Sequence, residues 1–193
     1  MVQLTGNNLI STAVFISGRG TNLKSLIKFS KKKNSPINIK LIISNTNKAK
    51  GLKYSKAYKI QKKVIDFKNK NIAEKKLSNL LSKKKIRFIC LAGFMKILSK
   101  KFIKKFSGKI VNIHPSLLPK YKGLNTHQKA LKNNDKYSGC TVHYVTDKVD
   151  SGKIILQKKV KIKRKDSLNT LTKKTLLEEH KPYPRAISKV FKN

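Results

Sequence analysis

Residues 12–23 have the sequence TAVFISGRGTNL, in which a short apolar run ends at a polar loop with two glycines. The run up to Ile16 is rich in β-forming residues and is typical of a buried strand. Leu23, Leu26 and Ile27 then recur at helical spacing. The stretch therefore predicts a strand, a tight turn and a helix, which is the repeating unit of an α/β protein.

The same alternation continues along the chain. Apolar runs predict further strands at residues 37–44, 63–67, 86–92 and 109–114. Helical spacing of apolar residues predicts helices at residues 49–58, 72–81 and 98–106. This order favours a Rossmann-like, mostly parallel twisted sheet with helices on both faces.

After residue 135 the pattern changes to two longer strands followed by two helices. The strands are expected at residues 140–145 and 153–162, and the helices at residues 167–177 and 184–191. We expect this C-terminal part to add an antiparallel element to the sheet. No repeat or linker is evident, so residues 1–193 are predicted to form a single domain.

The formal net charge is +39, with 47 lysines and arginines and only 8 acidic residues. Clustered positive charge is typical of nucleic-acid binding, but here the lysines are spread over nearly all predicted surfaces. Only four arginines are present, although arginine is the residue that forks onto phosphate or guanine. Mutational drift toward AT-rich codons is the favoured interpretation, with a basic nucleic-acid-binding protein as the competing one.

The chain has two cysteines, Cys90 and Cys140, with no zinc-type spacing around them. Two unpaired cysteines fit a reducing compartment. No apolar run approaches the length of a membrane span, and residues 1–8 do not have the hydrophobic core of a signal peptide. The expected location is the cytoplasm, without a membrane partner.

The loop after the first strand carries Gly18, Gly20, Thr21 and Asn22. Glycines permit close backbone approach, and the N–H groups at the start of the next helix can bind an anion. Leu23 stands where a dinucleotide fingerprint needs its third glycine, so a single phosphate is the better candidate. A plain strand-to-helix turn is the alternative.

Residues 111–119, with the sequence VNIHPSLLP, carry the richest polar pattern. Alternation along a strand puts Asn112 and His114 on one face, at the strand end where ligands bind in open α/β sheets. Imidazole can transfer protons near neutral pH, and an amide can donate to a developing oxyanion. The pair fits acyl or formyl transfer, and a purely structural polar pair is the alternative.

Asp150 lies in the stretch VTDKVDSG at residues 145–152, just before a Ser-Gly turn. A carboxylate near His114 is expected to raise the pKa of the imidazole and to steady its charged form. Asp150 can equally be an ordinary turn residue. The other histidines, His127, His143 and His180, show no compact ligand spacing, so no metal is expected, and His143 is interpreted as structural.

Four stretches resemble the phosphoribosylglycinamide formyltransferase family. They are ISGRGTNL at residues 16–23, LAGFMKIL at residues 91–98, NIHPSLLPKYKG at residues 112–123, and residues 139–157. The resemblance covers nearly the whole chain, and the third stretch is highly specific for folate-type formyltransferases. It implies 10-formyltetrahydrofolate as co-substrate, glycinamide ribonucleotide as acceptor, and a role in de novo purine biosynthesis.

The resemblance also implies the roles of individual residues. Asn112, His114 and Asp150 are the implied catalytic trio, with Asn112 on the oxyanion, His114 as proton shuttle and Asp150 orienting His114 and helping to accept the amine's proton. The implied acceptor-binding residues are Gly18, Gly20, Thr21, Asn22, Met95 and Glu179. The implied folate-binding residues are Phe94, Met95, Lys96, Ile97, Leu98, Val145 and Thr146. The expected assembly is a monomer or a homodimer.

Three positions depart from the family pattern. Asn125 stands where histidine is common, Lys96 replaces an arginine, and Leu176 replaces a polar residue near the phosphate. These changes bear on affinity more than on the type of reaction. Formyltetrahydrofolate hydrolase, which gives the formyl group to water, is the nearest enzyme alternative.

Overall fold

The N-terminal strands pair in parallel around β1 (Ile10–Ile16). β1 pairs with β2 (Ile37–Ser44) along one edge and with β4 (Phe88–Leu91) along the other, and β2 pairs with β3 (Gln61–Val64). β1 and β4 are apolar and buried along nearly their whole length, as a parallel sheet covered on both faces requires. Each large apolar side chain buried there stabilises the fold by about 1.5–3 kcal/mol.

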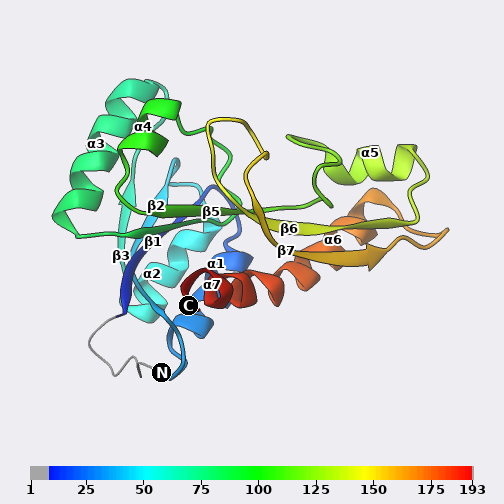
Figure 1. The fold of residues 1–193 in the computed structure, drawn as a ribbon, viewed down its shortest axis with the longest axis horizontal. Helices are drawn as coiled ribbons and strands as arrows, with labels where there is room; N and C mark the ends of the chain where they lie inside the picture. Colours follow the sequence, from blue (N-terminus) through cyan, green and yellow to red (C-terminus); the bar gives the residue numbers. More distant parts are fainter. Residues whose placement is uncertain (1–8, 193) are drawn as a thin grey trace. The chain divides into compact units, whose positions relative to one another are not determined.

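The computed structural model describes residues 9–192 and divides into two compact units, the first ending at Ile110 and the second beginning at Val111. Figure 1 shows α3 (Lys70–Lys83) and α4 (Lys100–Lys105) on one side of the strands of the first unit, and α1 (Thr21–Ser30) and α2 (Lys53–Tyr58) on the other. This unit also has a 3-10 turn, η1 (Lys50–Leu52). The expectation of a single domain over residues 1–193 stays a prediction.

β3 differs from the strand expected at residues 63–67. Its side chains are all exposed, and it pairs with β2 at the edge of these strands. Backbone pairing fixes its bounds, whereas the apolar Ile65 and Phe67, on which the expectation rested, follow the strand and are buried. Lysines on an exposed edge strand also discourage pairing with other chains.

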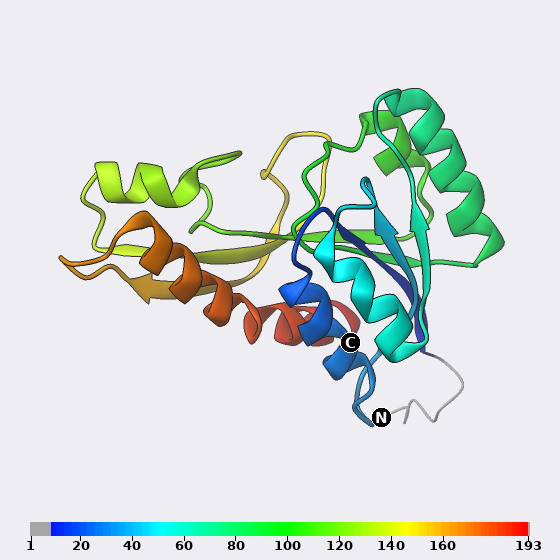
Figure 2. The same cartoon turned by 180° about the vertical axis from the view of Figure 1, so that it is seen from behind.

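The second unit is built on antiparallel strands. β5 (Lys109–His114), which spans the point of division, pairs antiparallel with β6 (Tyr137–Tyr144), and β6 pairs antiparallel with β7 (Ile154–Lys161). α6 and α7 contact β6 and β7 and lie along them in Figure 1 and Figure 2. The helices of this unit are α5 (Thr126–Lys132), α6 (Leu168–Glu179) and α7 (Pro182–Phe191).

The expected α/β class, with mostly parallel strands and an antiparallel C-terminal element, is confirmed. α7 is tied to its unit by Tyr183, whose side chain is fully buried and whose hydroxyl donates to the carbonyl of Val111 at 3.3 Å. This contact holds the last helix beside the start of the strand segment that carries the candidate site residues.

Candidate functional site

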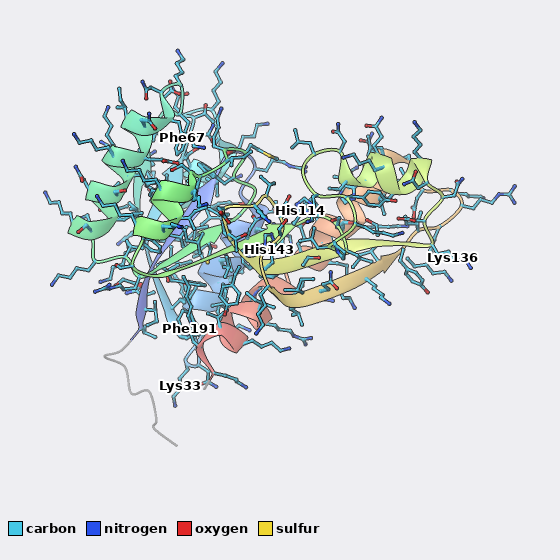
Figure 3. All side chains as sticks on the ribbon, turned by 45° about the horizontal axis from the view of Figure 1, so that its top comes forward. Lys33, Phe67, His114, Lys136, His143 and Phe191 are labelled. Carbon is cyan, nitrogen blue, oxygen red and sulfur yellow. The ribbon has the colours of Figure 1, made fainter. Side chains whose placement is uncertain are left out.

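β5 brings Asn112 and His114 to one place because alternate strand residues share a face. Their neighbour across the sheet is β6, whose register sets His143 opposite Asn112. The Asn112 amide nitrogen lies 3.3 Å from Nε2 of His143. Figure 3 shows the His114 and His143 side chains close together, so the site begins as a three-residue polar group on two paired strands.

Asp150 completes this group from the loop between β6 and β7. Its Oδ2 lies 3.2 Å from Nδ1 of His114, and its Oδ1 lies 3.5 Å from Nε2 of His143. The Asn112 amide donates to Oδ1 at 3.4 Å, and the backbone N–H of Gly123 donates to Oδ2 at 2.9 Å. Asp150 itself has φ +46°, a backbone conformation that is uncommon for a residue other than glycine. The structure thus brings Asn112, His114 and Asp150 together.

The loop after β5 is held by hydrogen bonds from the neighbouring strands. Thr141 of β6 donates its hydroxyl to the carbonyl of Ser116 at 2.6 Å and accepts the N–H of Leu118 at 3.0 Å. Gln157 of β7 donates to the Leu118 carbonyl at 2.8 Å. These bonds fix the turn that follows His114, so the imidazole stands on a rigid support.

Two acceptors flank the buried imidazole of His114. Nε2 lies 2.8 Å from the carbonyl of Tyr121, which can only accept, and Nδ1 faces the carboxylate of Asp150. Both contacts are satisfied together only when the ring carries two protons. Burial opposes that charge and is the dominant influence, so the pKa of His114 is lowered despite the Tyr121 carbonyl and Asp150, which raise it.

This result corrects the expectation that a nearby carboxylate raises the pKa of His114. Asp150 acts in the expected direction, but the loss of hydration around the ring outweighs it. The pKa of Asp150 is lowered as well: burial raises it, but the hydrogen bonds from His143 and the Gly123 N–H, with the charges of the histidines, outweigh burial. The site therefore pairs an ionised carboxylate with an imidazole that readily releases a proton.

His143 was interpreted from sequence as a structural strand residue, yet it joins this polar group. It is buried, and its Nδ1 lies 2.8 Å from the carbonyl of Tyr144. A carbonyl accepts only, so Nδ1 carries a proton, while Nε2 faces the Asn112 amide and Oδ1 of Asp150. The signal that could have found it is the pairing of β5 with β6, which spacing along one strand does not reveal.

The glycine loop lies in the first unit and leads into α1. Gly20 has φ +73° and is the residue before the helix, where it supplies no side-chain hydrogen bond. A Cβ at Gly20 would lie 2.6 Å from the Cα of Gly51, so only glycine allows this close backbone approach. Thr21 is half-buried and Asn22 is buried at the helix start.

The residues expected to contact the ligands differ in accessibility. In the first unit, Met95 and Ile97 are 70% and 63% exposed, whereas Leu98 is buried. Phe94 packs edge-on against Phe15 and Phe67, and the Met95 N–H donates to the Ser17 hydroxyl at 2.8 Å. The other residues expected in this role are Lys96, which is exposed, and three in the second unit: Val145 (half-buried), Thr146 (exposed) and Glu179 (buried).

Two other features bear on the chemistry that residues 9–192 can perform. This range has no helix long and apolar enough to cross a membrane, and no group of three metal-ligating His, Cys, Asp or Glu side chains. Burial, with the charges of Glu179 and Glu178, raises the pKa of Cys140 to about 12. Cys140 is therefore a protonated, unreactive thiol at neutral pH.

The fold and the grouped amide, imidazole and carboxylate define an α/β protein equipped for acyl-type group transfer. A family profile described as formyl transferase matches residues 10–187. The chain belongs to the formyl transferase family, and the family expected from the sequence is confirmed.

Individual relatives agree with this assignment. The phosphoribosylglycinamide formyltransferase of Haemophilus influenzae is 43% identical over 91% of this chain and 84% of its own length. The human trifunctional purine biosynthetic protein adenosine-3 is 43% identical over 92% of this chain, which spans 18% of that protein. The crystal structure of phosphoribosylglycinamide formyltransferase from Brucella melitensis superposes with a TM-score of 0.89 at 39% identity, over 94% of this chain and 95% of the other.

Proposed function

We propose that this chain transfers the formyl group of 10-formyltetrahydrofolate to the amine of glycinamide ribonucleotide, in de novo purine biosynthesis. The observation that carries the proposal is the meeting of Asn112, His114 and Asp150 within hydrogen-bonding reach of one another. Membership of the formyl transferase family and the similarity to phosphoribosylglycinamide formyltransferases support the same reaction.

The three side chains divide the work of the reaction. The folate co-substrate supplies the formyl carbon that the acceptor's amine attacks, so negative charge develops on the formyl oxygen. The Asn112 amide donates a hydrogen bond to that oxygen, which is the kind of contact that is strongest in the transition state. No covalent bond to the protein is needed.

Asp150 and His114 handle the proton that the attacking amine releases. Asp150 is ionised and accepts this proton, and Nδ1 of His114, 3.2 Å away, is the next acceptor. Burial lowers the pKa of His114 and favours release of the proton to the folate nitrogen as its bond to the formyl carbon breaks, so the carbonyl re-forms on the acceptor and tetrahydrofolate leaves. His143 restricts Asp150 to the orientation that faces both Asn112 and His114.

The remaining expected residues provide binding rather than chemistry. The loop of Gly18, Gly20, Thr21 and Asn22 holds the acceptor's phosphate through backbone N–H groups at the start of α1 and through the hydroxyl of Thr21. The exposed apolar side chains of Met95 and Ile97 fit the flat pteridine of the folate, whereas Leu98 is buried. We also propose a cytoplasmic location, a monomeric or homodimeric state, and no specific nucleic-acid partner.

The test is an assay of the purified protein with 10-formyltetrahydrofolate and either glycinamide ribonucleotide or water as acceptor. We expect formylated ribonucleotide to form in proportion to the folate consumed. Release of formate at the same rate with and without the ribonucleotide would instead identify a hydrolase.

A further inference from the structure

A short backbone segment after β5 touches both His114 and Asp150. The carbonyl of Tyr121 accepts from Nε2 of His114 at 2.8 Å, and the N–H of Gly123 donates to Oδ2 of Asp150 at 2.9 Å. Residues 121–123 therefore set the positions of two side chains that also contact each other. A shift of this segment would move both of them at once.

The backbone of Tyr121 is held in an unfavourable conformation. Its φ of +53° lies in the left-handed region, which is rare for a large side chain. Such a conformation persists only when surrounding contacts fix it. The Ser116 hydroxyl donates to the carbonyl of Lys120 at 2.7 Å. This bond ties Lys120, the residue before Tyr121, to the rigid turn that follows His114.

The side chain of Tyr121 supplies the other anchor. Its hydroxyl donates to Oδ2 of Asp135 at 2.8 Å and accepts from the Asn133 amide at 2.8 Å. Lys120 contacts Oδ1 of the same carboxylate at 3.0 Å, although this lysine is largely exposed. Asp135 lies just beyond the end of α5, in the segment that leads to β6.

The structure assigns a positioning role to Asp135: through the hydroxyl of Tyr121, it fixes the backbone that holds His114 and Asp150 for formyl transfer. This inference rests on the proposed function. Asp135 remains an ionised acceptor because the Tyr121 hydroxyl and Lys120 lower its pKa more than burial raises it. The side chain of Tyr121 thus links the Asp135 carboxylate to the backbone that contacts the His114 imidazole.

The inference predicts a change that can be seen at His114 itself. The charged or titratable groups that act on His114 are Asp150, His143, His127 and Lys129. The hydrogen bond from His114 to the Tyr121 carbonyl raises the pKa of the ring. Weakening the anchor should loosen this bond, so the pKa of His114 should fall while the four surrounding groups stay the same.

The experiment compares Tyr121→Phe and Asp135→Ala with the wild-type chain by NMR titration of the histidine side chains, with the His114 signal assigned by its loss in His114→Gln. We expect the His114 pKa to fall in both variants. We also expect kcat to fall roughly 10–100-fold, the cost of a small misplacement, with the acceptor KM nearly unchanged. Asp135→Asn, which keeps an acceptor oxygen for the tyrosine hydroxyl, should restore much of both properties.

Asp166→Ala is the matched control, because it removes an aspartate that also pairs with a lysine, Lys174, and lies outside this network. It should leave the His114 titration and kcat unchanged. An unchanged His114 titration in Tyr121→Phe and Asp135→Ala would overturn the positioning role. The NMR measurement needs no substrate, so it is separate from the proposed function, which would fail if the wild-type chain formed no formylated ribonucleotide.

Discussion

The glycine loop of the first unit and the polar group around Asp150 in the second unit are organised in opposite ways. The loop offers backbone at the start of α1, and the residue before the helix supplies no side-chain cap. The group around Asp150 is built from side chains that already bond to one another and to the backbone of Gly123 and Tyr121. The first suits the capture of an anion, and the second suits a reaction that needs groups fixed in advance.

The acidic residues are also unevenly distributed between the two units. Six of the eight lie after Ile110, and two of those six, Asp135 and Asp150, support the His114 imidazole directly or through Tyr121. The pKa of Asp150 is raised by burial but lowered further by its contacts with His143, the Gly123 N–H and the histidine charges, so the carboxylate stays ionised. The ionised state of Asp150 therefore results from its immediate neighbours and not from the lysine-rich surface.

The largest expected effect follows from removing the imidazole. His114→Ala should lower kcat by roughly 10²–10⁴-fold, because it deletes the group that takes the proton from Asp150. The measurement is the rate of formyl transfer at saturating substrates, with the melting temperature as a check on folding. Near-normal turnover in a folded variant would remove His114 from the mechanism.

A smaller effect, on binding alone, is expected at the glycine loop. Thr21→Val replaces the hydroxyl with a methyl group of similar size. It should raise the KM for glycinamide ribonucleotide about tenfold, the cost of one hydrogen bond to a charged group. The KM for the folate and the value of kcat should change little. A change in kcat without a change in acceptor KM would contradict the division between capture and chemistry.

The smallest effect concerns stability in acid. All four histidines lie in the second unit, and burial lowers the pKa of His114, His127 and His180 below 6.5. Because the unfolded chain then binds more protons, stability should fall as the pH drops below about 6.5. The carboxylate of Asp150, whose pKa is lowered, should begin to lose its stabilising contribution only when the pH falls toward 3.8, the ordinary pKa of aspartate, and below.

Amide hydrogen exchange at pH 7.5 and pH 5.5, corrected for the intrinsic rates, can locate this loss. We expect protection to fall more in residues 111–192 than in residues 9–110. An equal loss of protection in both units would show that the buried histidines do not determine the acid sensitivity.

Parts of this organisation could be predicted from the sequence because they depend on local patterns. Continuous apolar runs predicted the bounds that the structure shows for β2 and β5, which are Ile37–Ser44 and Lys109–His114. Strand alternation placed Asn112 and His114 together, and the Ser-Gly turn after Asp150 marked a loop. Each of these features is determined by a few residues that are neighbours in the sequence.

Other parts depend on contacts between distant segments and could not be predicted in this way. His143 enters the site through the register of β6 on β5, and Asp135 reaches it through the ring of Tyr121. The apolar pattern did not predict α5, because this helix of 7 residues buries only Thr126 and Ala130. The lowered pKa of His114 likewise results from burial, which no spacing along the chain reports.

The account depends most directly on Asp150, and the decisive measurement is kcat for Asp150→Asn beside Asp147→Asn. The two variants remove the same charge from the same loop, but only Asp150 lies against His114. We predict that Asp150→Asn lowers kcat by roughly 10²-fold or more, with little loss of melting temperature, and that Asp147→Asn remains close to the wild type. Equal turnover in the two variants, or a loss in Asp150→Asn that only follows unfolding, would contradict the account.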